Sequence, residues 1–229
     1  MESDGRRRLR KLHCMKCGSA LVSRTLQTHL DHVPRSLRDS TPHTYTRQVC
    51  AAVGCGWIHY NNPVPVVAAL IDHDDGEGHP DSRGVILVRG VGWPASWFGL
   101  VTGFLEAQED PARGVLREVK EEVGLEADSV SFLGVYPFPR INQLIIAYHI
   151  KVCGPLSEIR LQAEEIEAYK KVPLRSLRPW SEGTGLAVRD FLMKELGQAP
   201  PMLETAFRRP NKSDDSSASD ATQQIPAKL

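Results

Sequence analysis

Carboxylates gather in one short stretch of the sequence, residues 103–125. Glu118 lies three residues before Glu121 and four before Glu122, so on a helix the three side chains occupy neighbouring positions of one surface. Like charges at this spacing repel one another unless a divalent cation lies among them, and hard oxygen ligands suit Mg²⁺ or Mn²⁺. Such a cation can neutralise phosphate groups and acidify a bound water for attack on phosphorus. The stretch therefore indicates metal-dependent phosphoryl chemistry, with a solvated, charged helix face as the alternative.

Four cysteines in the N-terminal part are spaced for a second kind of metal. Cys14 and Cys17 are separated by two residues and followed by Gly18, the knuckle in which two thiolates bind Zn²⁺. Cys50 and Cys55 would complete a tetrahedral site of four sulfurs, although four residues separate them where two are commoner. The alternative is a set of buried or free thiols. Histidines are spare ligands if Cys50 or Cys55 does not reach the metal: His13, His29, His32 and His43.

The composition is that of a globular protein without a strong overall charge. The chain has 229 residues, 41% of them hydrophobic and 24% charged, enough for one medium domain and a small appendage. Lys and Arg together number 28, as do Asp and Glu, so no net field draws the molecule to nucleic acid or to an anionic membrane. No apolar run approaches the roughly 18 residues of a membrane helix, and the first residues do not resemble a signal peptide. We expect an intracellular protein whose thiols are reduced rather than paired in disulfides.

Several elements must position these residues. Asp110 before Pro111 is a typical helix start, and the helix is expected to run to about Glu122 before Gly124 ends it. Apolar patterns predict four strands and one further helix, and the polar segment Asp72–Ser82 is expected to be a hairpin loop rather than a metal site. The predicted strands are Val64–Ile71, Val85–Val88, Val130–Val135 and Leu144–Val152, and the helix is Gly185–Leu196.

Changes in composition divide the chain into four parts. Residues 1–12 form a basic leader, and residues 13–62 are too poor in aliphatic side chains to fold without a metal. Residues 63–200 alternate strands with helices, which predicts an α/β sandwich. Residues 201–229 are expected to be a disordered tail rich in Ser, Asp and Pro.

The carboxylate stretch resembles a known motif at every defined position. It reads Gly103, five residues, Glu109, seven residues, then Arg117-Glu118-Val119-Lys120-Glu121-Glu122-Val123-Gly124-Leu125. This pattern resembles the Nudix box of the Nudix hydrolases. The resemblance implies an α/β/α sandwich in which Glu118, Glu121 and Glu122 hold the metals, Arg117 orients Glu121, and Gly103 and Glu109 shape the loop ahead of the helix.

The order of the motifs narrows the resemblance. Cysteine knuckles followed by Tyr60-Asn61-Asn62-Pro63, a strand and a Nudix box are similar to the zinc-ribbon branch that contains NADH pyrophosphatase and related ADP-ribose and FAD pyrophosphatases. The segment Thr102–Glu106 matches the start of the box in that branch, with Thr in place of Ala. The NADH signature that follows the box is represented only by Tyr136–Pro139. The resemblance therefore implies hydrolysis of NAD(H), FAD or ADP-ribose with release of a nucleoside monophosphate, and leaves the dinucleotide open.

Further residues are candidates for contact with the substrate. Tyr136 and Phe138 could stack on a base, and Arg140 and Gln143 could hydrogen-bond to ribose or phosphate. The alternative is that the prolines around them only interrupt a strand at a sheet edge. Glu165, in the acidic cluster of residues 164–167, is a candidate additional metal ligand or base, with a solvated loop as the alternative.

The two ends of the chain suggest partners and rival functions. Ala227-Lys228-Leu229 differs by one small residue from a peroxisomal address, so an import receptor and a location in the peroxisome or a related organelle are expected, with the cytoplasm as the alternative. Zinc-ribbon relatives imply a possible homodimer. A rival hypothesis is an RNA-interacting Nudix protein that acts on or recognises a 5′ cap through the zinc ribbon and the basic run Arg6–Lys11. A third, a ligand sensor without turnover, is disfavoured because no carboxylate of the box is missing.

Overall fold

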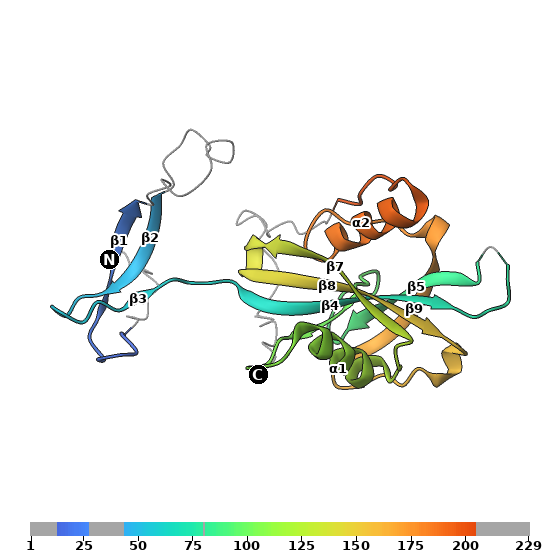
Figure 1. Ribbon diagram of the computed structural model, residues 1–229, viewed down its shortest axis with the longest axis horizontal. Helices are drawn as coiled ribbons and strands as arrows, with labels where there is room; N and C mark the ends of the chain where they lie inside the picture. The colour runs from blue at the N-terminus through green and yellow to red at the C-terminus, as the bar shows by residue number, and fades with distance from the viewer. Residues whose placement is uncertain (1–12, 28–43, 80, 205–229) are drawn as a thin grey trace, which may run out of the picture. The chain divides into compact units, whose positions relative to one another are not determined.

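The computed structural model describes residues 13–27, 44–79 and 81–204 of the chain (Figure 1). The basic leader, the spare histidines between residues 29 and 43, and the terminal Ala227-Lys228-Leu229 lie outside the described residues. The chain divides into two compact units, with the boundary in the sequence between Asn62 and Pro63. None of the described helices is both long and apolar enough to cross a bilayer.

The first unit contains a three-stranded antiparallel sheet. Its strands β1 (Leu21–Gln27), β2 (Thr44–Cys50) and β3 (Ile58–His59) lie in the order β1-β2-β3. Where the structure describes side-chain exposure in this unit, only Cys14, Val49 and Cys50 are buried. So small an apolar core does not stabilise a fold alone, and a bound metal would supply the missing stability.

The second unit is built on a six-stranded sheet in the order β7-β8-β4-β5-β9, with β6 paired to β4. β4 and β8 run parallel, and the other neighbouring pairs are antiparallel. The strands are β4 (Val64–Asp74), β5 (Arg83–Gly90), β6 (Val101–Phe104), β7 (Ser129–Phe138), β8 (Gln143–Cys153) and β9 (Ile166–Pro173). Short 3₁₀ helices lie at Pro139–Ile141, Leu156–Glu158 and Leu174–Ser176.

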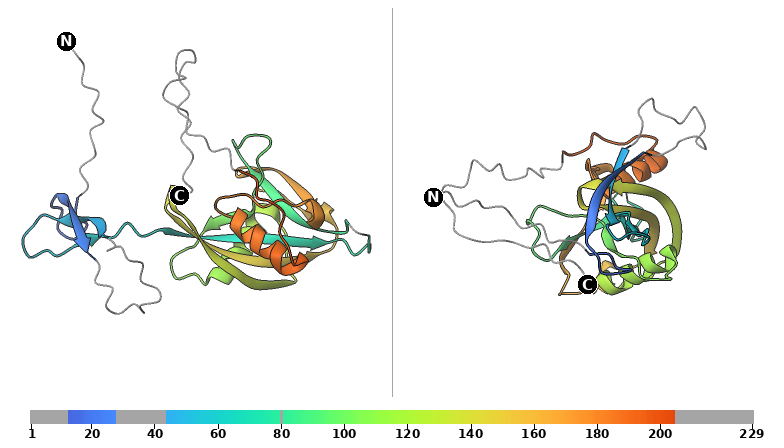
Figure 2. Two further views of the ribbon diagram at one scale, coloured as in Figure 1. Left: turned by 90° about the horizontal axis from the view of Figure 1, so that it is seen from above. Right: turned by 90° about the vertical axis from the view of Figure 1, so that its left-hand side faces the viewer.

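Two helices cover opposite faces of this sheet, as Figures 1 and 2 show, which confirms the predicted α/β/α sandwich. They are α1 (Pro111–Val123) and α2 (Gly185–Leu196). Along β4, Val67 and Ala69 pack in the core beside α1, whereas Ala68 and Leu70 pack in the core beside α2. A central strand buried on both faces explains why this stretch of sequence is continuously apolar.

Local chemistry sets the ends of α1. The Asp110 side chain accepts hydrogen bonds from the backbone N–H of Ala112 (2.9 Å) and Arg113 (3.3 Å). Gly124 ends the helix with a φ of 73°, a left-handed conformation that glycine adopts at little cost. Both ends were predicted from the sequence, and α2 also has its predicted bounds.

Two expectations about the chain outside these helices were wrong. Residues 72–74, expected in a loop, extend β4, and Asp72 is buried because Arg83 (2.6 Å) and His149 (2.9 Å) satisfy its carboxylate from neighbouring strands. The boundary of the expected disordered tail, residue 201, was placed too early in the chain. Leu203 forms a bridge with Trp180, and its N–H donates to the carbonyl of Pro179 (2.7 Å).

Candidate active site and metal centres

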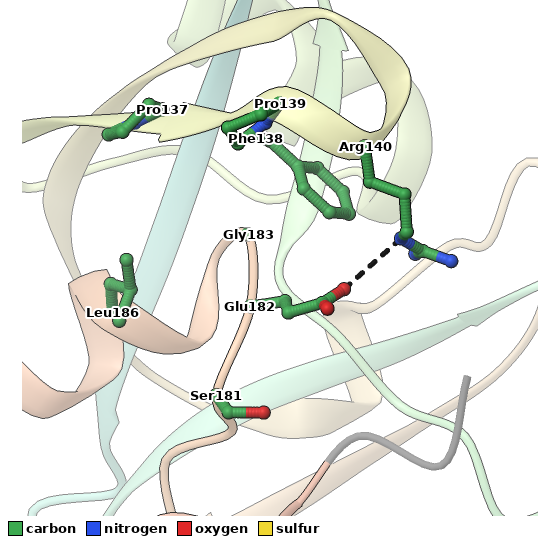
Figure 3. A pocket seen from close by; sticks show the side chains of 8 residues that line it. All are labelled: Pro137, Phe138, Pro139, Arg140, Ser181, Glu182, Gly183 and Leu186. Carbon is green, nitrogen blue, oxygen red and sulfur yellow. Dashed lines mark ion pairs between the residues drawn. The ribbon is translucent and has the colours of Figure 1, made fainter. Parts of the chain in front are cut away.

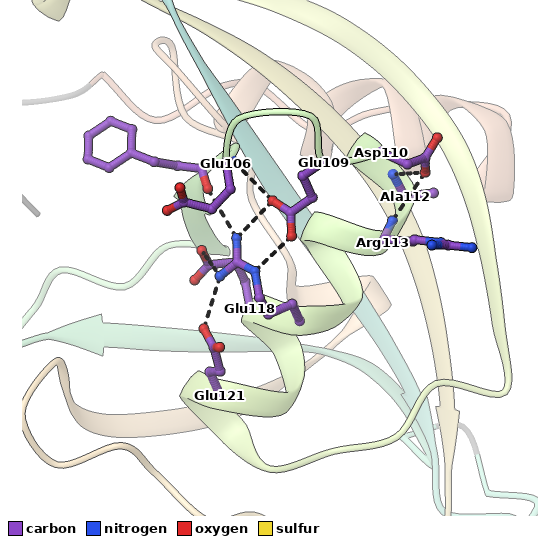
Figure 4. Close-up of polar contacts among 9 residues, drawn as sticks. Glu106, Glu109, Asp110, Ala112, Arg113, Glu118 and Glu121 are labelled. Atoms are coloured by element: carbon purple, nitrogen blue, oxygen red, sulfur yellow. Dashed lines mark hydrogen bonds and ion pairs between the residues drawn. The ribbon is translucent and has the colours of Figure 1, made fainter. Parts of the chain in front are cut away.

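One arginine, Arg117, joins residues of the carboxylate stretch, and Figure 4 labels three glutamates that it contacts, Glu109, Glu118 and Glu121. Arg117 donates from Nε to Glu109 Oε1 (2.8 Å), and from Nη2 to Glu109 Oε2 (3.1 Å) and to the carbonyl of Phe104 (3.2 Å). Its Nη1 donates to Glu118 Oε1 (2.8 Å) and Glu121 Oε2 (3.0 Å). A single guanidinium therefore ties the end of β6 and the loop ahead of α1 to two carboxylates of the helix.

Glu109 is held as a carboxylate that positions its neighbours. The hydrogen bonds from Arg117 and then the backbone N–H of Glu106 lower the pKa of Glu109 to about 2. The same contacts raise the pKa of Arg117 above its usual value. Gly114 leaves room for this pair, because a Cβ at that position would lie 2.9 Å from Glu109 Oε2. A group with so low a pKa is suited to orienting Arg117 and unsuited to accepting a proton near neutral pH.

The Glu118 carboxylate occupies the space that a side chain at position 103 would need. A Cβ built on Gly103 in β6 would lie 1.8 Å from both Cδ and Oε1 of Glu118. The Glu118 carboxylate, which is buried, therefore lies directly over the glycine backbone. Any larger residue at position 103 would displace it, which gives a physical reason for glycine at the start of the motif.

The other two glutamates of α1 differ in exposure. The side chain of Glu121 is half exposed, whereas Glu122 is buried. The carbonyl of Glu122 accepts a hydrogen bond from the N–H of Gln162 (3.0 Å), which fixes the segment after α1 against the end of the helix. These carboxylates supply hard oxygen donors of the kind that Mg²⁺ or Mn²⁺ prefers, with Glu121 open to solvent, but among the described residues the three do not lie within 4.8 Å of one another as the four cysteine sulfurs do.

The four N-terminal cysteines converge, including the two whose spacing is unusual. Sγ of Cys14 lies 3.7 Å from that of Cys55, Sγ of Cys17 lies 3.5 Å from that of Cys50, and all four lie within 4.8 Å of one another. Zinc–sulfur bonds of about 2.3 Å in a tetrahedron place sulfurs about 3.8 Å apart, so these thiols could hold Zn²⁺. No spare histidine is needed.

Two of the candidate substrate residues line a pocket of about 280 Å³, drawn in Figure 3. Phe138 and Arg140 lie on one side of it, and the Arg140 guanidinium lies 5.2 Å from the Phe138 ring. Arg140 Nε forms an ion pair with Glu182 Oε2 (3.1 Å) across the pocket. The remaining lining residues are Pro137, Pro139, Ser181, Gly183 and Leu186, so no residue of α1 lines this pocket.

Tyr136 and Gln143 do not contribute side chains to that pocket. Tyr136 is buried in the core beside α2, its hydroxyl donates to Asp190 (3.0 Å), and burial raises its pKa. The expectation that Tyr136 stacks on a base is therefore wrong, because its ring packs against core side chains. Gln143 begins β8 with Phe138 as its neighbour in β7, so it stays near the predicted partners without lining the pocket.

Glu165 lies in a segment that is hydrogen-bonded to the end of α1. Its N–H donates to the carbonyl of Gln162 (3.0 Å), the residue that is itself bonded to Glu122. Its position at this end of α1 keeps it a candidate for an additional ligand or base. Its neighbour Glu167 instead pairs with Arg89 (3.2 Å) and accepts from the N–H of Gly92 (3.3 Å).

A family match decides the identity of the second unit. The family model described as the NUDIX domain matches residues 62–191, more than half of the chain. The chain belongs to the Nudix family. Within this Nudix protein, the box positions Glu109, Glu118 and Glu121 meet at Arg117, and Gly103 lies under Glu118.

Curated relatives and solved structures resemble this Nudix protein in part of their length. A Pseudomonas aeruginosa protein named "NAD-capped RNA hydrolase NudC" is 28% identical over 152 residues, 65% of this chain and 51% of that protein. The Mus musculus protein "NAD(P)H pyrophosphatase NUDT13, mitochondrial" is 32% identical over 64% of this chain and 38% of its own. The chain thus spans about half or less of these relatives. A Nudix hydrolase structure from Nitrosomonas europaea has a TM-score of 0.48 at 21% identity, covering 84% of this chain and 96% of that one.

The predicted hairpin loop between β4 and β5 contains a cluster of polar side chains. Ligand atoms of Asp75, Glu77 and His79 lie within 4.8 Å of one another at the surface. Asp75 pairs with Lys171 (3.1 Å) and accepts from the N–H of Glu77 (3.1 Å), while His79 lies 3.3 Å from Glu77. These contacts are those of a polar hairpin loop, and they assign no metal to this Nudix domain.

Proposed function

We propose that this Nudix protein hydrolyses the diphosphate bond of a dinucleotide of the NAD(H), FAD or ADP-ribose class and releases a nucleoside monophosphate. The observation that carries the proposal is the complete box network, in which Arg117 joins Glu109 to Glu118 and Glu121. The relatives named for NAD-capped RNA and NAD(P)H support the NAD class among the dinucleotides.

Glu118, Glu121 and Glu122 would hold Mg²⁺ or Mn²⁺. A divalent cation bound there would neutralise the diphosphate and lower the pKa of a bound water. Arg117 fixes the rotamers of Glu118 and Glu121, and Gly103 leaves the space that the Glu118 carboxylate occupies. Glu165 is a candidate to receive the proton of the attacking water or to complete the ligand set.

Zn²⁺ at Cys14, Cys17, Cys50 and Cys55 would have a structural role. With four protein ligands the site has no open position for a substrate, and it joins the two turns that flank β1 and β2 in a unit with little apolar core. The Ser19 hydroxyl and N–H lower the pKa of the Cys17 thiol to about 6, whereas burial and the neighbouring thiols raise the pKa of Cys50 to about 12.

RNA with a dinucleotide cap is a second candidate substrate, and the first unit supplies a specific observation for it. Arg24 and Arg47 lie directly opposite each other on β1 and β2, and the Arg47 guanidinium lies 5.7 Å from the Tyr60 ring. Like charges in this position are unfavourable unless an anion lies nearby. The described residues of this unit contain Lys16 with these arginines and no Asp or Glu. Basic and aromatic side chains together suit a single-stranded nucleic acid.

Two further proposals concern partners. The C-terminal Ala227-Lys228-Leu229 would bind a peroxisomal import receptor, and replacing Leu229 by Asp would then move a tagged chain out of peroxisomes. A homodimer would appear as twice the mass of 25.4 kDa in light scattering, and a monomer mass would exclude it.

The test of the proposed function is release of a nucleoside monophosphate by the purified full chain. The panel contains NADH, NAD, FAD, ADP-ribose, coenzyme A and NAD-capped RNA, each with Mg²⁺ or Mn²⁺ and with excess chelator. Chelator-sensitive cleavage of a free dinucleotide supports the first proposal and names the substrate. Cleavage of capped RNA alone, lost in Arg24→Ser/Arg47→Ser, supports the second. No cleavage of any member contradicts both.

A further inference from the structure

A tryptophan in the loop between β5 and β6 packs against two glycines. A Cβ built on Gly90 would lie 3.0 Å from Cε2 and 3.1 Å from Nε1 of the Trp93 indole. A Cβ built on Gly99 would lie 3.4 Å from Cζ3 and 3.6 Å from Cη2 of the same ring. Trp93 is nevertheless 44% exposed. The indole is therefore supported by backbone on its inner side and open to solvent elsewhere.

Hydrogen bonds hold the loop that carries this indole. The N–H of Trp93 donates to the carbonyl of Gly90 (3.1 Å), and the N–H of Gly92 donates to Glu167 (3.3 Å). Arg89 bonds both to Glu167 (3.2 Å) and to the carbonyl of Ala95 (3.2 Å). An aromatic side chain on an anchored loop loses little conformational entropy when a ligand binds.

The indole lies on the same face of the sheet as the box. Gly99 pairs with Val88, which belongs to the core beside α1, and directly opposed residues share a face. Val101 follows on that face, and Gly103, under the Glu118 carboxylate, is the next residue on it. Four residues of extended chain separate Gly99 from Gly103, a distance of about 13 Å.

Backbone contacts around the rim connect the same two places. The N–H of Val91 donates to the carbonyl of Glu165 (2.8 Å). Glu165 and Gln162 are bonded, and Gln162 is bonded to Glu122 of α1 (3.0 Å each). The loop of Trp93 and the carboxylate helix therefore border one continuous surface.

We propose that Trp93 stacks on the nicotinamide, flavin or adenine ring of the dinucleotide while the diphosphate lies at the α1 carboxylates. The inference rests on the proposed function for the position of the diphosphate. Every base has a π face, so stacking accepts any of these rings, and one stacked ring changes binding by about tenfold to a hundredfold. Phe138 and Arg140 line a pocket without α1 residues, whereas Trp93 shares a face with the box.

The experiment compares Trp93→Leu with the conservative Trp93→Phe and with Phe132→Leu. Phe132 is an exposed aromatic residue on β7, at the opposite edge of the sheet from β5 and β9. We expect Trp93→Leu to raise KM for the best dinucleotide at least about tenfold with kcat within threefold. Trp93→Phe and Phe132→Leu should stay within about threefold of the wild type, and thermal unfolding should be unchanged in all three.

A binding measurement separates this inference from the proposed hydrolysis. Calorimetric titration with NAD and Mg²⁺ of the chain carrying Glu121→Gln measures affinity without turnover, and adding Trp93→Leu should weaken it by the same factor as KM. If the wild type binds NAD but cleaves nothing, the loss in Trp93→Leu upholds the stacking while the proposed function fails. An unchanged KM and unchanged affinity in Trp93→Leu overturn the stacking, as does a wild type that binds no dinucleotide.

Discussion

Replacing Gly103 by alanine is the sharpest perturbation of the carboxylate site. The new Cβ would lie 1.8 Å from Cδ and Oε1 of Glu118, so the carboxylate must retreat by about 1.6 Å to reach an ordinary contact of 3.4 Å. The carboxylate is the far end of a flexible side chain and can move, so the free energy of unfolding of Gly103→Ala should change little. A reacting group misplaced by about 1 Å costs on the order of 100-fold in rate. We therefore expect kcat of Gly103→Ala to fall about 100-fold with the fold intact.

Gly84→Ala is the matched control for a methyl group inserted into the same sheet. Its Cβ would lie 2.7 Å from the carbonyl oxygen of Val172, which is backbone and cannot turn away. We expect this variant to lose about 1–3 kcal/mol of stability but to keep its kcat in the folded fraction. Denaturant unfolding followed by circular dichroism, and nucleoside monophosphate release at saturating substrate, measure the two quantities. A Gly103→Ala variant with kcat within twofold of the wild type would refute the claim that Gly103 leaves space that the Glu118 carboxylate needs for catalysis.

Three further predictions concern stability and metal content. Arg117 lowers the pKa of Glu109 only in the folded state, so this carboxylate stabilises the fold fully above its ordinary pKa of 4.5, and the stabilisation is lost as pH falls toward about 2. Glu109→Gln should remove that stabilisation. The unfolding midpoints at pH 7 and pH 3 should therefore differ less in the variant than in the wild type. Cys50→Ser should lower the zinc content from one ion per chain in atomic emission, and retention of a full ion would contradict a four-sulfur site. Asp72→Asn should cost about 1–3 kcal/mol in denaturant unfolding, because the buried side chain loses its charge-assisted hydrogen bonds to Arg83 and His149 while Arg83 keeps its pair with Glu195, and a cost below about 0.5 kcal/mol would contradict this role.

Elements with local determinants were predictable from the sequence. The cap of α1 depends on Asp110 and the amides two and three residues later, and its end depends on the backbone freedom of Gly124. The apolar spacing of residues 185–196 set α2 in the same way. The box residues were also identifiable through their resemblance to the Nudix box, and in the structure Gly103 and Glu109 meet Glu118 and Arg117.

Features with distant determinants were not predictable. Asp72 reads as a loop residue, yet its partner His149 lies 77 positions away in β8 and makes burial possible. β9 was missed because it is an edge strand whose Glu167, Lys170 and Lys171 interrupt the apolar pattern. Tyr136 was taken for a substrate residue because nothing near it in sequence indicates that its hydroxyl bonds to Asp190. The position of the Trp93 indole was not predictable because it depends on contacts with both Gly90 and Gly99, which the fold brings together.

The most direct test of the central claim is the rate of nucleoside monophosphate release by Glu118→Gln beside the wild type, on the best substrate of the panel with saturating Mn²⁺. The substitution keeps the shape of the buried side chain and removes its charge. We predict a fall in kcat of about a thousandfold, equivalent to about 4 kcal/mol, with unchanged thermal unfolding. A folded Glu118→Gln variant whose kcat stays within tenfold of the wild type would contradict catalysis at the α1 carboxylates.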